Sequence, residues 1–542
     1  MTADILVALL DACERTPAAP AMSLGRRTLT FAELRDAILT VAEALGEEGL
    51  VEGDRVLFSV RPGLDGICLA LGVIAAGGTI VFADPGAGDA MFRARAALAA
   101  PRWVAAESLL YAVSRGPLRR VARARGLELP DYSSVVPDAR HIVAGAWLPG
   151  VPRGAVPVRS LLRRSGWSAP TRIRRRPFGR RLPDPASGSE PLPTRTAAKS
   201  LRDSSEPAGV GPSPTTEATR KAEALVIFTS GTTAHPKAVV HSRGSLGTGL
   251  GDFATSVGFV PGEVVLTDQL MVGIPALISG AHWVLPPAGA DPGAKPEKYL
   301  DLLPGADVLF AVPAALDALL GMLERQPTKT PKLRVLLVGG APVLRPLLER
   351  VRRQLPGTAV RAIYGMTEIL PVAIADGDEK LAFDGAGDYV GELMSAITAT
   401  VVDDELVLAG DGLALGYLGE PPLTQLRTGD LARIEGDRLI LSGRSKDMFI
   451  RGTTNVYPGL YEPVIAGIPG VDDAALVGIP NSMGDDELVL VIVGDASRVE
   501  RALPGLIDAA VMPDRIVTMD ALPRTGRSLK LDRAALVQLL CA

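Results

Sequence analysis

Apolar positions along the first part of the chain follow two alternating spacings. Between residues 31 and 45 they recur every three to four positions, which is the spacing of an amphipathic helix. The short apolar run Arg55–Ser59 that follows has the length and composition of a buried strand. The first hundred residues keep this rhythm, so the sequence predicts an α/β domain at the N-terminal end of the chain.

One apolar segment, from Gly66 to Ala83, reaches the lower length limit of a membrane-spanning helix and contains no charged residue. Gly77 and Gly78 divide it into a half rich in Leu and Ala and a strand-like half, Thr79–Phe82. We therefore expect a buried helix, a turn and a strand here, and no stable membrane span.

The rhythm stops in a basic stretch and then returns. Between residues 151 and 222 there are 15 Lys and Arg against 5 Asp and Glu, among many Pro, Ser and Gly residues and with almost no apolar periodicity. Such a composition buries too little apolar surface to offset the ordering entropy, so we expect residues 152–219 to form a disordered or loosely attached insert. A solvated linker, a nucleic-acid- or membrane-binding insert and an out-of-frame reading of a GC-rich gene all stay open.

Alternating strands and helices resume at Ala224 and are expected to continue to about Ser442, including a strand at 333–338 and a helix at 344–355. The last hundred residues combine short strands with helical stretches, which indicates a small α+β domain. A chain of 542 residues exceeds what one core supports, so we predict an N-terminal domain of layered α/β subdomains over 1–442 and a second domain over 443–542.

Bulk composition favours a soluble globular protein, since 47% of residues are hydrophobic and 22% are charged. A net charge of −4 gives no chain-wide electrostatic signal for nucleic acid or anionic lipid. Cys13, Cys68 and Cys541 are too far apart in sequence to suggest a disulfide framework or a metal cluster. The N-terminus lacks the pattern of a secretory signal. We expect a cytoplasmic protein without a nucleic-acid partner.

The most informative chemistry follows the apolar run 224–228, in a loop dense in hydroxyl groups that ends in a lysine. Hydroxyl and backbone N–H groups donate to phosphate oxygens, and a lysine adds a mobile positive charge. The spacing differs from that of the ordinary P-loop, and a plain Ser/Thr-rich turn is the alternative interpretation. The candidate phosphate-binding residues are Thr229, Ser230, Gly231, Thr232, Thr233 and Lys237.

This loop resembles the phosphate loop of the adenylate-forming superfamily of acyl-CoA synthetases, peptide-synthetase adenylation domains and luciferases. Further stretches resemble that superfamily's motifs in the same order along nearly the whole chain except the basic insert. They are 29–34, 75–85, Gly339-Gly340-Ala341-Pro342, Tyr364-Gly365-Met366-Thr367-Glu368, Arg427-Thr428-Gly429-Asp430, Gly443-Arg444-Ser445-Lys446-Asp447 and the segment 523–532 around Lys530.

The resemblance implies a role for each residue in the nucleotide site. Tyr364 would stack on adenine, which the backbone of Gly340 and Ala341 would approach closely. Thr367 would donate to the α-phosphate and Glu368 would hold Mg²⁺.

The remaining implied roles involve the ribose and the C-terminal domain. Asp430 would accept hydrogen bonds from both ribose hydroxyls, and Arg444 would contact the same sugar. Lys446 would mark a hinge about which the mobile C-terminal domain rotates. Lys530 would bridge the acyl carboxylate and the α-phosphate, although its spacing is wider than the superfamily's usual Gly-Lys.

Two features depart from the superfamily pattern. Ala234 and Ala238 replace glycines in the phosphate loop, which narrows its backbone freedom. The segment after Leu266 lacks the histidine or aromatic residue that many acyl-CoA synthetases carry beside the acyl pocket. None of the four histidines forms a convincing catalytic site, and the Gly-x-Ser-x-Gly motif of hydrolases is absent.

The resemblance implies an acid–thiol ligase that uses ATP, Mg²⁺ and CoA. We expect an apolar acid, such as a fatty acid, because the segment 271–280 offers no charged partner for a polar substrate. Residues 84–88 and 364–373 also resemble β-lactone synthetases of bacterial olefin biosynthesis, whereas 444–452 reads more like a CoA ligase. A degenerate member that binds nucleotide without turnover is the non-enzymatic alternative, against which the retention of Lys237, Glu368, Asp430 and Lys530 argues.

Overall fold

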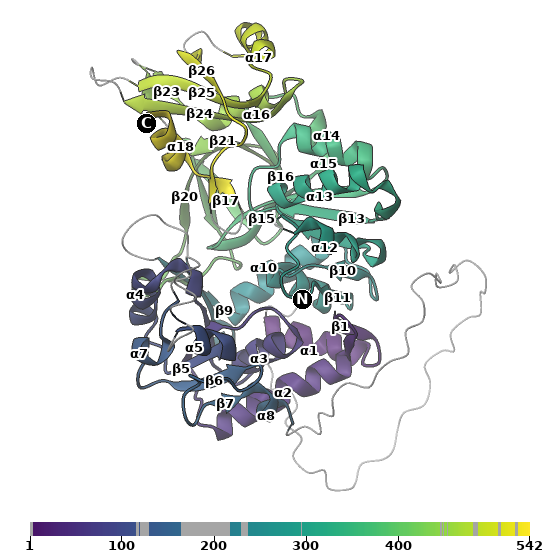
Figure 1. The fold of residues 1–542 in the computed structure, drawn as a ribbon, viewed down its shortest axis with the longest axis vertical. Helices are drawn as coiled ribbons and strands as arrows, with labels where there is room; N and C mark the ends of the chain where they lie inside the picture. Colours follow the sequence, from purple (N-terminus) through teal and green to yellow (C-terminus); the bar gives the residue numbers. More distant parts are fainter. Residues whose placement is uncertain are drawn as a thin grey trace, which may run out of the picture.

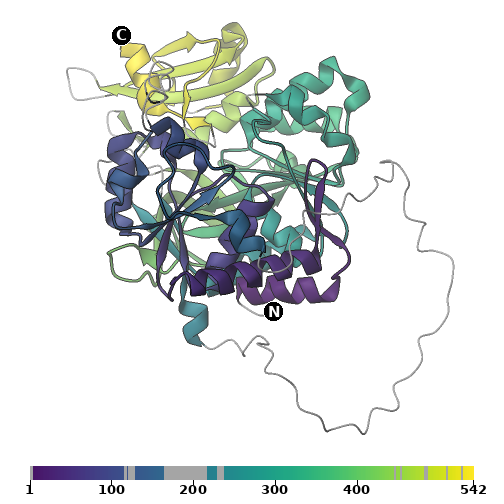
Figure 2. The same ribbon diagram turned by 60° about the horizontal axis from the view of Figure 1, so that its bottom comes forward.

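The computed structural model shows a large N-terminal region built on two sheets and a smaller C-terminal region above it (Figure 1). Figure 2 shows the C-terminal strands and the last helix together at one end of the molecule. The structure describes residues 4–114, 119, 129–163, 217–228, 237–293, 295–444, 447, 449–451, 454–480, 486–507, 511–525 and 529–541.

The first sheet has eight strands in the order β19-β9-β8-β4-β3-β5-β6-β7. Strands β3 to β8 run parallel to one another, whereas β9 and β19 are antiparallel additions at one edge. The strands are β3 Arg55–Ser59, β4 Thr79–Phe82, β5 Trp103–Glu107, β6 Arg140–Ala144, β7 Val156–Pro157, β8 Glu223–Phe228, β9 Ala238–Ser242 and β19 Gly416–Tyr417. The candidate phosphate-binding residues therefore follow, in sequence, the carboxyl end of β8, the parallel strand that lies next to antiparallel β9.

The second sheet has thirteen strands in the order β17-β18-β20-β21-β16-β15-β14-β13-β12-β10-β11-β1-β2. Its middle, from β1 to β14, is parallel, and the strands from β15 onward pair antiparallel. The strands are β1 Pro20–Leu24, β2 Arg27–Thr30, β10 Val264–Leu266, β11 His282–Leu285, β12 Val308–Ala311, β13 Val335–Gly339, β14 Ala359–Met366, β15 Ile369–Asp376, β16 Asp388–Leu393, β17 Thr398–Val402, β18 Glu405–Ala409, β20 Leu426–Glu435 and β21 Arg438–Arg444.

Amphipathic helices cover these sheets and share a core with them. The helix α2 begins with a capping box. The side chain of Thr30 accepts a hydrogen bond from the backbone N–H of Glu33, and the side chain of Glu33 accepts one from the backbone N–H of Thr30. The N-terminal helices are α1 Ile5–Arg15, α2 Phe31–Glu47, α3 Leu64–Ala75, α4 Asp89–Ala99, α5 Ser108–Ser114, α7 Tyr132–Val135, α8 Val158–Arg163, α9 Glu217–Lys221, α10 Arg243–Val257, α11 Leu270–Ile278, α12 Pro296–Leu300, α13 Pro313–Arg325, α14 Arg345–Gln354 and α15 Gly377–Ala382.

The C-terminal region has its own apolar core, formed by β24, β25 and the helices beside them. Its elements are β22 Phe449–Arg451, β23 Thr454–Val456, α16 Pro458–Ala466, β24 Val471–Pro480, β25 Asp486–Gly494, α17 Ala496–Ala502, β26 Arg515–Thr518, β27 Arg524–Thr525, β28 Lys530–Leu531 and α18 Arg533–Cys541. It meets the large region where α16 begins, at a contact so close that a β-carbon on Gly459 would lie 2.6 Å from Cα of Gly443.

Two predictions about local structure are wrong. The α/β alternation does not continue to Ser442, because the chain from β14 to β21 is mostly antiparallel strand with one short helix, α15. The insert predicted over 152–219 begins and ends inside ordered structure. Strand β7 pairs with β6, and α8 buries Val158, Leu161 and Leu162 in the main core, a three-to-four-residue spacing that the surrounding arginines obscured.

Two further predictions concern the rest of the insert and the apolar segment 66–83. Residues 164–216, the greater part of the predicted insert, lie outside the described residues. The segment 66–83 folds as predicted into a helix, which is most of α3, followed by a turn and β4. In the part of the chain that the structure describes, no helix combines the length and the apolar character needed to cross a membrane.

Candidate active site

A hairpin in the thirteen-stranded sheet places three of the predicted site residues together. Strand β14 ends at Met366, Thr367 and Glu368 form the turn, and β15 returns from Ile369. Tyr364 lies two residues before the end of β14. The hairpin therefore presents Tyr364, Thr367 and Glu368 at the carboxyl edge of the parallel strands, where ligands bind in open α/β sheets.

The next parallel strand, β13, brings Gly340 and Ala341 beside this hairpin. Gly339 pairs with Ile363, so the chain leaves β13 directly alongside Tyr364. Gly340 has φ 86°, a left-handed conformation that glycine adopts without steric cost. Ala341 is partly buried. The structure thus places the backbone of these two residues close to Tyr364 in sheet register.

Asp430 joins Tyr364 and Arg444 into one hydrogen-bonded group. The Tyr364 hydroxyl donates to Oδ2 of Asp430 at 2.5 Å, and Nε of Arg444 donates to Oδ1 at 2.6 Å. Asp430 lies opposite Arg444 across the β20–β21 ladder and is 2% exposed. A carboxylate this buried needs a cationic partner, and Arg444 provides it.

The pKa values of Tyr364 and Arg444 in this group are shifted. Burial raises the pKa of Tyr364, and the negative charge of Asp430 adds to the effect, so the phenol stays protonated and donates. Burial alone would lower the pKa of Arg444, but its attraction to Asp430 outweighs burial, and the pKa is raised. At neutral pH, Tyr364 is therefore a neutral donor and Arg444 a cation.

On the other side of the hairpin, Glu368 and Lys237 meet through Tyr417. The Tyr417 hydroxyl donates to Oε1 of Glu368 at 2.8 Å, and Nζ of Lys237 lies 5.0 Å from the centroid of the Tyr417 ring. The antiparallel pairing of β19 with β9 places Tyr417 opposite Val239, two residues after Lys237 along the chain. The sequence analysis did not identify Tyr417, and its signal is a Gly-Tyr dipeptide without distinctive chemistry.

His241 fixes the backbone of the hairpin turn. Its Nε2 lies 2.7 Å from the carbonyl oxygen of Thr367, an acceptor, so this nitrogen carries the proton, and Nδ1 faces Oγ of Ser245 at 3.3 Å. Burial lowers the pKa of His241, although its bond to Thr367 and the charge of Glu368 oppose the shift. His241 is a positioning residue that the sequence analysis missed.

Several predicted site residues are not brought into this group by the structure. Thr229, Ser230, Gly231, Thr232 and Thr233 lie outside the described residues, as do Ala234 and Lys446. Lys530 is exposed in the β27–β28 hairpin, where it pairs with Thr525. Its assignment to the α-phosphate stays a prediction.

The residues at the hairpin suit a magnesium ion that arrives with a nucleotide. Among the described residues, no three His, Cys, Asp or Glu side chains gather as a metal-binding group. Mg²⁺ commonly binds through one or two carboxylates, waters and substrate phosphates. Glu368, a partly buried carboxylate at a turn with one oxygen oriented by Tyr417, fits such a site.

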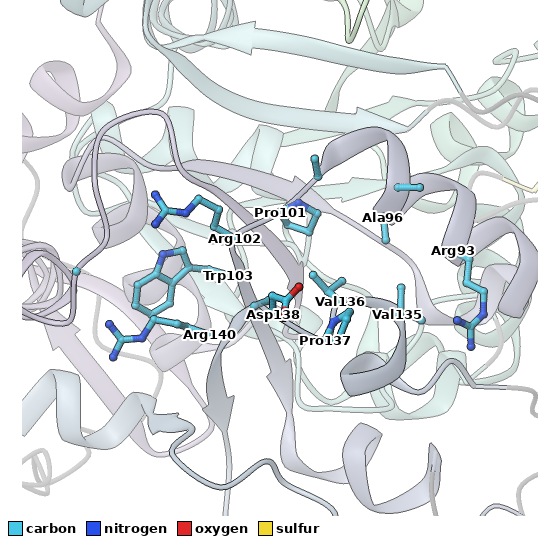
Figure 3. A pocket seen from close by; sticks show the side chains of 14 residues that line it. Arg93, Ala96, Pro101, Arg102, Trp103, Val135, Val136, Pro137, Asp138 and Arg140 are labelled. Carbon is cyan, nitrogen blue, oxygen red and sulfur yellow. The ribbon is translucent and has the colours of Figure 1, made fainter.

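A surface cavity of about 640 Å³ lies elsewhere on the eight-stranded sheet (Figure 3). It opens at the amino ends of β5 and β6, near Trp103 and Arg140, whereas the hairpin and Lys237 lie at carboxyl ends of parallel strands. Two of its arginines already have acidic partners, since Arg102 binds Asp54 and Arg140 binds Glu48. This cavity is separate from the candidate active site.

Comparison with known proteins agrees with the fold. The AMP-binding enzyme family matches residues 9–418. The chain is 28% identical over 342 residues to the long-chain-fatty-acid–CoA ligase FadD13 of Mycobacterium tuberculosis (strain CDC 1551 / Oshkosh), an alignment that covers 56% of this chain and 66% of that protein. It is also 28% identical over 335 residues to a feruloyl-CoA synthase of Amycolatopsis sp, which covers 56% of this chain and 67% of that protein.

Solved structures resemble the chain over nearly its full length. The amide bond synthetase McbA from Marinactinospora thermotolerans has a TM-score of 0.73 at 20% identity, and MatB from Rhodopseudomonas palustris has 0.69 at 22% identity. In each case 99% of both chains is covered. The fold and the residues gathered at the hairpin define an enzyme of the adenylate-forming class. The chain belongs to the AMP-binding enzyme family.

Proposed function

We propose that the protein activates an organic acid with ATP and Mg²⁺ and transfers the acyl group to CoA. An acid oxygen attacks the α-phosphorus of ATP, so pyrophosphate leaves and an acyl-AMP forms. The CoA sulfur then attacks the acyl carbon, and AMP leaves. The observation that carries this proposal is the pair of groups on one hairpin, Tyr364 with Asp430 and Arg444 on one side, and Glu368 with Tyr417 and Lys237 on the other.

Each group suits one end of a nucleotide. A buried carboxylate beside a tyrosine ring suits a ribose and its base, because Asp430 retains lone pairs for the sugar hydroxyls after accepting from Tyr364 and Arg444. The carboxylate of Glu368 would hold the metal, which offsets phosphate charge when bound, and the ammonium of Lys237 would lie near the outer phosphates. Thr367 would face the α-phosphate between them.

An apolar cavity supports an apolar acid as the substrate. Side chains of α1, α3, α10 and α11 surround a space of about 40 Å³, and Met271 and Ile274 of the predicted pocket segment are among them. Leu250 also lines it, and the residue before Leu250, Gly249, packs so closely on the hairpin that a β-carbon would lie 2.4 Å from the carbonyl oxygen of Leu370. The cavity thus lies one helix away from the hairpin, and its lining is apolar, although its volume is too small to hold a fatty acyl chain.

The proposal also includes the acyl acceptor, CoA, and a rotation of the C-terminal domain. We assign residues 443–542 as a domain that rotates between the two half-reactions, first presenting Lys530 for adenylation. The fold shared with an amide bond synthetase shows that this scaffold also carries a different acceptor chemistry in another protein. The segment 84–88 keeps a β-lactone-forming second step as the alternative.

Pyrophosphate release, measured with ATP and a panel of acids, tests the proposal. The expected result is release that requires Mg²⁺, is strongest with fatty acids and yields acyl-CoA when CoA is present. Lactone formed from a β-hydroxy acid without CoA would replace thioester formation by the alternative. A folded protein that binds ATP but releases no pyrophosphate with any acid would favour the alternative of a degenerate family member that binds nucleotide without turnover.

A further inference from the structure

Tyr417 contacts both charged residues that are assigned to the outer end of the nucleotide. Its hydroxyl donates to Glu368 at 2.8 Å, while its ring lies under the ammonium of Lys237, 5.0 Å from the ring centroid. One side chain thus links an anion on the thirteen-stranded sheet to a cation at the edge of the eight-stranded sheet. The two contacts use different parts of the side chain, so each can be removed separately.

The backbone around Tyr417 is bonded to both partners as well. Leu415 N–H donates to Val240 and Leu418 N–H donates to Ala238, each at 2.8 Å, which attaches the segment to β9 directly after Lys237. Ala414 N–H donates to the carbonyl oxygen of Glu368 at 2.8 Å, which attaches the same segment to the hairpin turn. Residues 414–418 therefore bridge the two sheets, and the position of the Tyr417 ring follows from that bridge.

We infer that Tyr417 is a positioning residue that holds Glu368 and Lys237 at a fixed spacing, so that the metal and the outer phosphates of ATP bind as one unit. This inference rests on the proposed function. A hydrogen bond to a ligating carboxylate orients it and reduces the entropy that metal binding must overcome. The ring of Tyr417 attracts the ammonium of Lys237 through its quadrupole.

Two substitutions separate the two contacts. Tyr417→Phe removes the hydroxyl and keeps the ring under Lys237. It should raise the Mg²⁺ or Mn²⁺ concentration needed for half-maximal binding by about 10-fold, with ATP affinity at saturating metal unchanged. Tyr417→Leu removes both contacts, and it should also weaken ATP binding at saturating metal by about 2- to 5-fold. Calorimetry of ATP binding at varied metal, and Mn²⁺ binding followed by electron paramagnetic resonance with ATP present, measure these changes without turnover.

The chain offers a matched control. The Tyr389 hydroxyl donates to Glu379 at 3.1 Å, and the guanidinium of Arg438 lies 4.8 Å from its ring centroid, so Tyr389 makes the same two kinds of contact away from the hairpin. Tyr389→Phe should leave the metal requirement unchanged. A purely structural loss would instead lower the thermal stability of both Phe variants and shift neither metal curve.

The outcomes distinguish this inference from the proposed function. If the wild type binds ATP and releases pyrophosphate, but Tyr417→Phe keeps the wild-type metal dependence, the positioning role is wrong and the proposed function stands. If the wild type neither binds ATP nor releases pyrophosphate, both are wrong. Tyr417→Phe changes a single hydroxyl and decides the question even if Tyr417→Leu does not fold.

Discussion

Glu368 lies at the turn of a hairpin, where its backbone carbonyl and its side chain are both held by residues from the 414–418 bridge. The backbone carbonyl of its neighbour Thr367 accepts a hydrogen bond from His241. A carboxylate so restrained is preorganised, which is how metal ligands gain affinity beyond their charge. We therefore expect the contribution of Glu368 to metal binding and adenylation to depend on its negative charge and not on its shape.

Glu368→Gln tests this consequence. The amide has nearly the same shape and can still accept from Tyr417, but it brings no negative charge to the metal. We expect pyrophosphate release to fall by roughly 10²-fold, of the order seen when one preorganised electrostatic group is removed, with an unchanged unfolding temperature. Glu43→Gln, on the exposed face of α2, is the control and should be silent. Near-normal turnover of folded Glu368→Gln protein would reject the metal-ligand assignment.

The sequence predicted the residues that stand in motifs at the candidate site but not those that position them. Tyr364, Glu368, Asp430 and Arg444 stand in recognisable motifs, and the structure brings Tyr364, Asp430 and Arg444 into direct contact. Tyr417 acts on a residue 49 positions away, and His241 on one 126 positions away. Contacts over such separations produce no recognisable motif in the sequence, because they arise from pairing between strands that are distant in sequence.

At the scale of elements, α11 packs against β11 without space for a side chain at Gly273. A β-carbon there would lie 2.1 Å from the ring of Trp283. Trp283 is fully buried and donates its indole N–H to the carbonyl oxygen of Thr267 at 2.8 Å, so the ring cannot move aside cheaply. The fit of this helix on its strand depends on the missing β-carbon.

Gly273→Ala should therefore destabilise the fold by about 1–3 kcal/mol, the usual cost of overpacking. Gly251→Ala is the matched control. Gly251 also lies inside a helix, α10, but a β-carbon there would meet nothing within 4 Å. Alanine should stabilise that position by about 0.5–1 kcal/mol, because glycine loses more backbone entropy in a helix. Urea unfolding of the two variants measures both effects, and equal signs would contradict the packing argument.

Strand β11 also carries a pH-dependent contact with β1. Burial lowers the pKa of His282 to about 4, and its Nε2 lies 2.7 Å from Oγ of Ser23. Below the ordinary histidine pKa near 6.5, the unfolded chain binds a proton that the folded chain does not. The contribution of neutral His282 is therefore complete above about pH 6.5 and is lost as the pH falls to about 4. The loss is on the order of 3 kcal/mol.

His282→Gln isolates this contribution, because glutamine can still bond Ser23 but does not titrate. Denaturant unfolding of both proteins between pH 7 and pH 4 should show a steeper decline for the wild type. Parallel pH profiles would mean that His282 titrates normally in the folded protein.

At the scale of the molecule, the sequence predicted the α/β class and the separate character of the last hundred residues, and both agree with the structure. It did not predict that the strands from β14 to β21 turn antiparallel. Short apolar runs look alike in parallel and antiparallel sheets, and only their partners distinguish them. The helix α8 was missed for a similar reason. Its position in the core depends on three buried apolar residues, and the many arginines around them conceal that pattern in the sequence.

The proposed rotation of the C-terminal domain makes Lys530 specific to one half-reaction. A lysine placed at the α-phosphate cannot stay there while another face of its domain covers the site. Lys530→Ala should lose roughly 10²-fold or more of acyl-AMP formation. Supplied with synthetic acyl-AMP and CoA, the variant should still form acyl-CoA at a rate near that of the wild type. Lys332→Ala, another exposed lysine, should affect neither step.

Single-turnover assays of the two half-reactions measure this separation. A parallel fall of both in folded Lys530→Ala protein would rule out the rotating-domain mechanism for this chain.

The contact between Gly443 and Gly459 limits how this junction can vary among descendants of the sequence. A β-carbon at Gly459 would lie 2.6 Å from Cα of Gly443. At Gly443 the φ of 141°, which residues with a β-carbon rarely adopt, opposes substitution instead. No second change at the partner can restore the space, because the partner already has the smallest residue. In a randomly mutagenised library selected for function, the two codons should therefore be depleted of variants together. Both glycine positions would then be expected to resist substitution.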